Sequence, residues 1–314
     1  MFMKLNKAFF VCTWDILKHT FTNFFEDRGM KLSASLAYYT IFSLAPMLIV
    51  IISLSGIFFG SDAIEGKIFS QINEFVGNQA AIQIQEIIKN AQKSGDSQFA
   101  VFVGLITLGI GATGIFIEIQ DSINYIWHVK AKPKRGWVKM LLNRFISFSL
   151  VVSLGFLLIV SLVINGLMIA LSSQINKYFP DMTILFVNIF NLVLTFSVIS
   201  FLFAIIFKIL PDVKIRWRDV SVGAMFTALL FMLGKYVIGL YLGQGDLGSA
   251  YGAAGSLIII LLWVYYSSVI LYFGAEFTQV YAEKIGCRIE PSDYAVYVST
   301  VIKEKVVDVL PKQN

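Results

Sequence analysis

The stretch that decides the fold is residues 251–282, "YGAAGSLIIILLWVYYSSVILYFGAEFTQVYA". From its first residue to Ala275 it contains no Asp, Glu, Lys or Arg, and Glu276 then follows within the last apolar turns. A helix of about 20 apolar residues is long enough to cross the hydrocarbon core of a bilayer. The stretch therefore predicts a membrane-spanning helix with a carboxyl group near one end.

The composition of the whole chain agrees with a membrane protein. Apolar residues make up 57% of the 314 residues and charged residues only 14%, whereas soluble domains have about 25% charged residues. The mean hydropathy is +0.75. Such a surface would be poorly hydrated in water, so it must face lipid. The connections between apolar segments are short, which favours one integral-membrane domain.

Six segments are long and apolar enough to cross the membrane, and only the fifth is interrupted, by Lys235. They are residues 32–61, 99–117, 145–176, 182–207, 220–245 and 247–275. We therefore expect an all-α integral membrane bundle of six transmembrane helices. Residues 1–31 are expected to form a cytoplasmic or interfacial amphipathic helix, residues 32–282 the six-span membrane domain, and residues 283–314 a cytoplasmic tail.

The distribution of basic residues predicts the orientation. Most of the 25 Lys and Arg lie before the first span, in the second and fourth connections, and after the last span. Because basic residues concentrate on the cytoplasmic side, both termini are expected there. The net charge of +5 is then explained by topology and by contact with anionic lipids, at about 1 kcal/mol for each basic residue near the surface. We expect the bilayer as partner and no binding of nucleic acid.

Two segments outside the spans have amphipathic patterns. Residues 62–95, "DAIEGKIFSQINEFVGNQAAIQIQEIIKNAQKSG", predict an extracytoplasmic pair of helices between spans one and two. This pair is either a lid that packs on the bundle or a gate for a substrate. Before the first span, apolar residues recur at helical spacing and predict a helix in the cytoplasmic interface. They are Phe9, Phe10, Trp14, Leu17, Phe21, Phe24 and Phe25.

Known enzyme signatures are rejected or missing. Residues 243–248 match the glycine pattern of dinucleotide-binding folds, but they follow a membrane span on the outer side, where the required strand and helix do not fit. The only histidines are His19 and His128, too few for a histidine-rich metal site. The only cysteines, Cys12 and Cys287, are expected to be free thiols. We therefore expect no cofactor, no metal and no enzymatic activity.

Two ionisable residues within the spans are the strongest functional candidates, because such residues are costly in lipid. Glu276 would either close the inner mouth of the bundle, paired with Arg144 or Arg216, or act as a carboxyl group coupled to protons or substrate. Lys235 would either extend towards the outer interface or bind an anionic head group. Their expected depths differ by about 20 Å, too far for an ion pair.

Further candidates lie in the first two spans. Glu118 is expected at the depth of Glu276, so that both flank one inner cavity, and Asp121 and Asn124 follow within two turns. Solvation at the interface would equally explain these polar residues and Trp127. The glycines of span two favour close helix packing. Pro46 predicts either a kink in the first span or a hinge.

Three stretches resemble one known family. Residues 32–54, "LSASLAYYTIFSLAPMLIVIISL", residues 110–129, "IGATGIFIEIQDSINYIWHV", and residues 251–282 are similar to the YihY/BrkB family of bacterial inner-membrane proteins. The resemblance implies a six-span bundle in the bacterial inner membrane, with an activity that is not settled for the family. Some members have the older label ribonuclease BN, and others are linked to serum resistance as virulence factors. No catalytic residues can be transferred.

The sequence favours a transporter or lipid-translocating protein, with a cavity among spans one, two, five and six. An envelope protein with a purely structural role is the alternative. The tRNA-processing ribonuclease is disfavoured, because the chain contains no metal-ligand cluster and its two candidate carboxylates lie at membrane level. The substrate, the coupling ion, the direction of transport and the oligomeric state do not follow from the sequence.

Overall fold

The computed structural model describes residues 7–43, 114–132, 180–244 and 255–298, together with Asn78 and Ile82. This part of the chain is mostly helical, as expected. The long helices are α1 (Lys7–Glu26), α7 (Pro180–Ile209), α8 (Trp217–Gln244) and α10 (Gly255–Lys284). Residues 29–43 and 114–126 are also helical.

Three of the helices are long and apolar enough to cross a membrane. These segments are Ile189–Ile209, Trp217–Tyr241 and Leu257–Lys284, and they agree with the predicted fourth, fifth and sixth spans. Helical residues 29–43 and 114–126 overlap the predicted first and second spans. The third span, Pro46 and nearly all of residues 62–95 lie outside the described residues, so the count of six spans and the orientation stay predictions.

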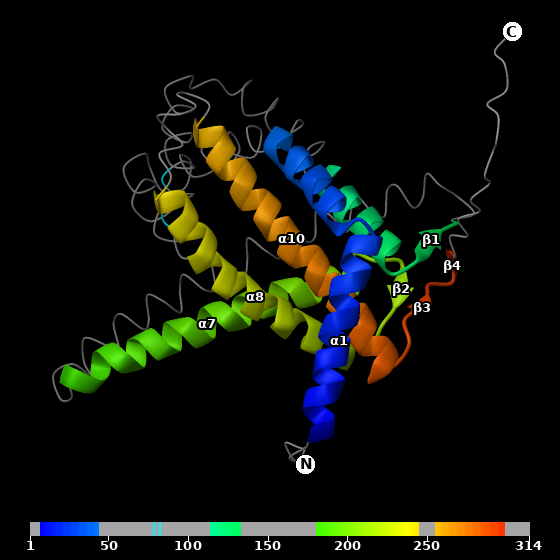
Figure 1. Cartoon of the computed structure of the whole chain (residues 1–314), viewed down its shortest axis with the longest axis horizontal. Helices are drawn as coiled ribbons and strands as arrows, with labels where there is room; N and C mark the ends of the chain where they lie inside the picture. Colours follow the sequence, from blue (N-terminus) through cyan, green and yellow to red (C-terminus); the bar gives the residue numbers. More distant parts are fainter. Residues whose placement is uncertain are drawn as a thin grey trace, which may run out of the picture.

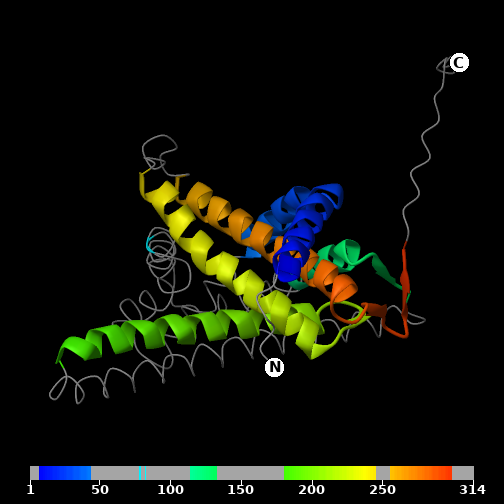
Figure 2. The same cartoon turned by 60° about the horizontal axis from the view of Figure 1, so that its bottom comes forward.

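Helix α10 lies at the centre of the described bundle. It runs beside α8, while α7 packs against α8 and α1 crosses the opposite side of α10. Figure 2 shows the same pairing of α8 and α10 from another direction. From Ser268 to Ala282, most side chains of α10 are buried, because the surrounding helices cover every face of that half.

Small residues bring α8 and α10 close together. A Cβ atom at Gly223 would lie 1.9 Å from Thr278 Oγ1, and one at Gly274 would lie 2.0 Å from Thr227 Oγ1. Each threonine hydroxyl donates to the carbonyl four residues earlier, over 2.7 Å. The two helices thus use the same Gly-x-x-x-Thr pattern in opposite directions, which permits close backbone approach. In the predicted second span, a Cβ atom at Gly114 would lie 3.7 Å from Tyr39 Cδ1, an ordinary contact distance.

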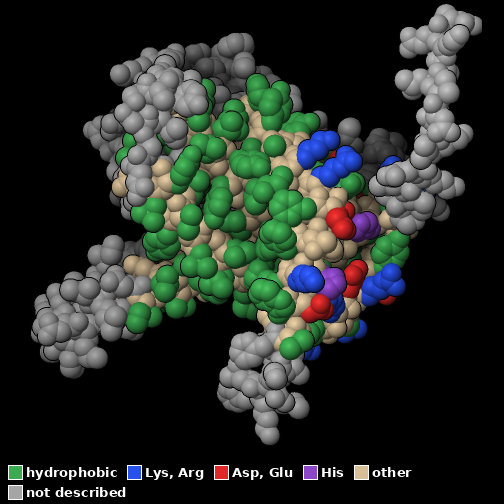
Figure 3. Space-filling view, in the orientation of Figure 1, with side chains coloured by type: hydrophobic (Ala, Val, Ile, Leu, Met, Phe, Trp, Pro, Cys, Tyr) green, Lys and Arg blue, Asp and Glu red, His purple; other side chains and the backbone are tan. Residues whose placement is uncertain are grey.

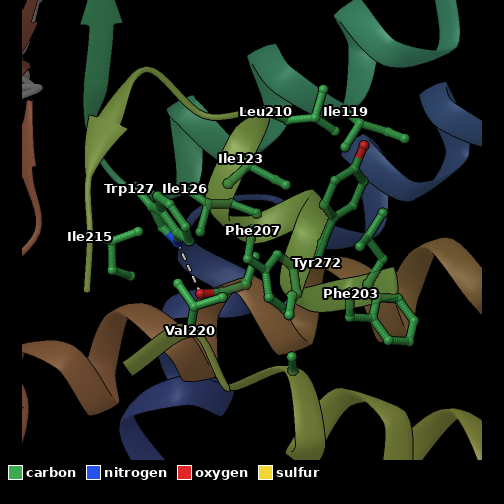
Figure 4. Close-up of a cluster of buried hydrophobic side chains, with 14 of the residues drawn as sticks. Ile119, Ile123, Ile126, Trp127, Phe203, Phe207, Leu210, Ile215, Val220 and Tyr272 are labelled. Carbon is green, nitrogen blue, oxygen red and sulfur yellow. Dashed lines mark hydrogen bonds between the residues drawn. The ribbon is translucent and has the colours of Figure 1, made fainter. Parts of the chain in front are cut away.

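The largest buried side chains gather where α7, α8, α10 and residues 114–126 meet. Figure 4 shows this core, in which Trp127 and Tyr272 lie among aliphatic and aromatic neighbours. Trp127 is only 2% exposed, and its indole Nε1 donates to the carbonyl of Ala275 over 3.0 Å. This hydrogen bond fixes the end of residues 114–126 against α10.

Short strands join the connections at the same end of the bundle, an addition to the all-α expectation. Strand β1 (Val129–Ala131) pairs antiparallel with β4 (Ala295–Tyr297), and β2 (Val213–Lys214) pairs antiparallel with β3 (Glu290–Pro291). The first part of the expected cytoplasmic tail is therefore attached to two connections of the bundle. The strands are too short to give an alternating pattern, so the sequence did not predict them.

Candidate functional site

The candidate site begins with a polar stripe on α10, which we define as Tyr272, Glu276 and Gln279. These residues are four and three positions apart, so they lie on one face of the helix. Tyr272 and Glu276 are completely buried, and Gln279 is 7% exposed. The stripe faces residues 114–128 and the turn between α1 and the helical residues 29–43.

Four buried oxygen atoms of the polar stripe make no hydrogen bond of good geometry among the described residues. They are the Tyr272 hydroxyl, which lies beside Ser122, both carboxyl oxygens of Glu276, which lie beside Asp27, and the amide oxygen of Gln279. The large majority of buried side-chain polar atoms in native proteins are hydrogen-bonded, and leaving one unsatisfied costs about 1–3 kcal/mol. The polar stripe is therefore a place where water, a proton or a ligand would be stabilised.

A second carboxyl group faces Glu276 across this site. Asp27, in the turn after α1, lies next to Glu276, and its side chain is only 14% exposed. The Nε2 atom of His128 is 3.6 Å from Asp27 Oδ1, and the Nδ1 atom of His128 is 3.4 Å from Gln279 Nε2. The contacts thus run from Glu276 through Asp27 and His128, whose ring is 47% exposed, to Gln279.

The electrostatics of the site favour keeping a proton. Burial raises the pKa of Asp27, and Glu26 acts in the same direction, while His128 and the contact with Glu276 oppose it. The other acidic groups around Glu276 are Glu26 and Glu283. Two carboxyl groups side by side in a buried site resist being ionised together and titrate as a pair. The arrangement can hold one proton and release it when the surroundings change.

The turns that position Asp27 and His128 are strained. Arg28 has a φ of 57° and His128 a φ of 53°, and they are the only described non-glycine residues with positive φ. This left-handed conformation costs a non-glycine residue about 1–2 kcal/mol, and such residues gather at functional sites. One strained turn follows α1 and presents Asp27, and the other ends with His128. Both lie at the polar stripe.

The predicted pairing of Glu276 with an arginine is not found in the described part of the chain. Arg216 is exposed, and none of the ion pairs among the described residues includes Glu276. Arg144 lies outside the described residues. The acidic Asp27 occupies the neighbouring position instead, because the turn after α1 reaches the buried half of α10.

Of the other predicted candidates, Glu118 lies near the polar stripe, whereas Asp121 and Lys235 lie elsewhere. Glu118 is partly buried near the Tyr272 hydroxyl, and Asp121 is exposed. Lys235 is partly buried, with its Nζ atom 5.8 Å from the centre of the Tyr236 ring. Its neighbour Gly234 packs on Tyr266 of α10. Tyr266 precedes Glu276 by about 15 Å of helix, so Lys235 does not belong to the polar stripe.

Asn124 is buried and has a packing role, which corrects the expectation of interfacial solvation. Its Nδ2 atom donates to Asp212 Oδ2 over 2.8 Å, and its Oδ1 atom accepts from the Asp212 backbone N–H over 2.8 Å. Gln120 Nε2 donates to Asp212 Oδ1 over 3.2 Å. We call Gln120, Asn124 and Asp212 the Asp212 clamp. It joins residues 114–126 to the connection between α7 and α8, and Trp127 is likewise buried.

Sequence reasoning missed Asp27, His128, Gln279 and Asp212. Asp27 and His128 each follow the end of a helix, and no spacing in the sequence relates them to Glu276. The described residues contain no group of three or more His, Cys, Asp or Glu able to hold a metal ion. The described side chains of the site, Asp27, His128, Glu276 and Gln279, can bind protons and form hydrogen bonds.

Comparisons with known proteins agree with the membrane architecture. The sequence profile of the family described as Virulence factor BrkB matches residues 20–294. A UPF0761 membrane protein of Pseudomonas paraeruginosa is 29% identical over 260 residues, which cover 80% of this chain and 59% of that protein. A UPF0761 membrane protein of Pseudoalteromonas atlantica is 28% identical over 273 residues, covering 85% of this chain and 86% of the relative. No solved structure matches the chain.

Proposed function

The chain belongs to the Virulence factor BrkB family, and we propose that it is a transport protein of the bacterial inner membrane that works through the carboxyl pair Asp27–Glu276. Its cargo is a small solute or a lipid, moved together with protons. The proposal includes no enzymatic activity, no cofactor and no nucleic-acid partner.

One observation carries this proposal: the polar stripe of α10 is buried, lacks hydrogen bonds of good geometry among the described residues, and faces a second carboxyl group. Ionisable residues within membrane helices mark ion pathways and proton relays. A carboxyl group with a purely structural role is expected to be satisfied, as Asp212 is in its clamp. The lack of a well-formed hydrogen bond at Glu276, together with its contact with Asp27, favours a group that exchanges a proton.

The contacts of the site suggest the route of that proton. The half-exposed ring of His128 meets the cytoplasmic water and contacts Asp27, which faces Glu276. A proton received there would be shared by the two carboxyl groups. When the proton leaves, the two carboxylates repel each other and push the turn after α1 away from α10. Lys235, at a different depth, would bind the anionic part of the cargo.

The test is proton flux into proteoliposomes that contain a pH-sensitive dye. Glu276→Gln removes the titrating group and keeps the size of the side chain, so it should abolish the flux of the wild-type protein. Asp219→Asn is the matched control, because Asp219 is also buried, at 2% exposed, but its Oδ2 accepts a hydrogen bond from the Cys287 backbone N–H over 3.1 Å. This variant should keep the flux.

Each outcome decides between functions. Equal flux in the wild type and Glu276→Gln would remove the carboxyl pair from the transport path. Without any flux, lipid scrambling in the same vesicles distinguishes uncoupled lipid translocation from a structural envelope role, in which neither activity occurs. Cleavage of a labelled tRNA precursor by the purified protein, with or without divalent metal, would favour the ribonuclease instead.

A further inference from the structure

Helix α1 has an exposed aromatic face that the bundle leaves uncovered. We define this aromatic face as Val11, Trp14, Phe21 and Phe25, which are 63%, 73%, 59% and 50% exposed. Their spacing of three, seven and four residues places them along one side of the helix. Four large apolar side chains in a row, all at least half exposed, require an apolar environment outside the described bundle.

A second face of α1 packs against α10. Ile16 is 3% exposed and lies in a cluster with Phe277 and Val280. Further along, the ring centres of Phe24 and Phe273 are 5.6 Å apart. These contacts fix the rotation of α1 about its axis, so the aromatic face cannot turn towards the bundle.

A third face of α1 is polar and is joined to the end of α10. Lys284 forms an ion pair with Asp15, and its Nζ atom lies 2.9 Å from His19 Nδ1. The side chains of Asp15 and His19 are about half exposed, and Glu26 is exposed. The three faces thus meet protein, water and a third, apolar environment, the arrangement of a helix that lies in a membrane interface.

The surface around the aromatic face identifies that environment. Figure 3 shows hydrophobic side chains over most of the front of the bundle, while Lys, Arg, Asp, Glu and His gather on the right of the view, where α1 and the end of α10 lie. The hydrophobic surface of the spans faces hydrocarbon. A helix face that continues this surface, at the end where charged residues begin, lies at the boundary between hydrocarbon and head groups.

We propose that α1 lies in the cytoplasmic leaflet of the bilayer, with the aromatic face in the acyl chains and Lys18 at anionic head groups. Lys18 is exposed and lies one turn after Trp14 and one turn before Phe21, on the side of the aromatic face. Its long side chain lets the ammonium group reach the head groups. This positive charge favours a lipid surface over a second copy of the same face, which would bring two lysines together.

Spin labels on the full chain in proteoliposomes test the depth of α1. Both native cysteines are first replaced (Cys12→Ser and Cys287→Ser), and one label is attached through Phe21→Cys or through Thr22→Cys. Thr22 is the matched control, because it is exposed and, as the next residue, lies about 100° around the helix from Phe21, on the side of Asp15 and Glu26. The label at position 21 should be relaxed by oxygen, which dissolves in lipid, and protected from a water-soluble nickel chelate. The label at position 22 should show the reverse.

Equal access of the nickel chelate to both positions would overturn the proposal. Spin–spin broadening between labels at position 21 of different molecules would overturn it in favour of a dimer contact.

The contact of Lys18 with anionic head groups is tested in vesicles of phosphatidylcholine with and without phosphatidylglycerol. Position 21 should become more accessible to the chelate without the anionic lipid, and Lys18→Gln should remove this difference. An equal depth in both vesicles would refute the head-group contact. Transport is not measured in either assay.

Discussion

The two opposite faces of α10 at the buried end of the bundle are built in contrasting ways. Towards α8, Gly274 and Thr278 interlock with Thr227 and Gly223, and both hydroxyls have a hydrogen-bond acceptor. Towards residues 114–128, the polar stripe leaves four buried oxygen atoms without a hydrogen bond of good geometry among the described residues. The face towards α8 is closely packed and its hydroxyl groups are hydrogen-bonded, whereas the polar stripe retains unsatisfied polar groups.

This difference is what we expect if one face of the helix serves stability and the other serves the proposed transport. Natural proteins accept local destabilisation at sites that must bind or move something. On this interpretation, changes on the α8 face lower the free energy of unfolding. Changes of the polar stripe affect transport and leave the free energy of unfolding the same or higher.

The largest effect on stability is expected from Asp212→Ala in the Asp212 clamp. The change leaves the buried amides of Gln120 and Asn124 without their acceptor, at a cost of about 1–3 kcal/mol for each. Thermal unfolding in detergent, followed by tryptophan fluorescence, measures the loss. Glu276→Gln, measured in parallel, should unfold at the wild-type temperature or above. A larger loss in Glu276→Gln than in Asp212→Ala would contradict the contrast between the two sites.

A smaller loss is expected from Gly274→Ala on the packed face. The new methyl group would lie 2.0 Å from Thr227 Oγ1, so the helices must separate, at a cost of about 1–3 kcal/mol. Gly239→Ala is the matched control in α8, because a Cβ atom there has no neighbour within 4 Å. It should be neutral or stabilise the helix by up to about 1 kcal/mol. Similar unfolding temperatures for both variants would mean that the close approach is unimportant.

The smallest effect is the dependence of stability on pH through Asp27. Burial raises the pKa of this carboxyl group above its ordinary value of 3.8, so the folded state binds the proton more tightly than the unfolded state. The stabilisation is complete below that ordinary value and is lost as the pH rises through the pKa of the folded state. Thermal unfolding of the wild type should show this decline, and Asp27→Asn should reduce it. An unchanged profile in Asp27→Asn would assign the decline to other groups.

The sequence predicted the apolar helices, because a chain segment in hydrocarbon must be largely uncharged and must satisfy its backbone hydrogen bonds within itself, as a long helix does. It also identified Glu276, whose charge interrupts such a segment. It could not place Asp27 and His128 beside Glu276, because these residues come from distant segments that only the tertiary fold brings together. Solvation at the interface stayed an open explanation for Asn124 and Trp127, because local polarity does not reveal the burial that Asp212 and Ala275 produce. The Gly-x-x-x-Thr pattern at residues 223–227 and 274–278, by contrast, was present in the sequence and was overlooked.

The pairing of β1 with β4 has a consequence for biogenesis. Val129 of β1 is opposite Tyr297 of β4, and β4 follows α10 in the chain. During translation, β1 therefore waits without its partner strand until α10 and β4 have left the ribosome. This end of the described bundle is fastened only after the helices between β1 and β4 have been synthesised.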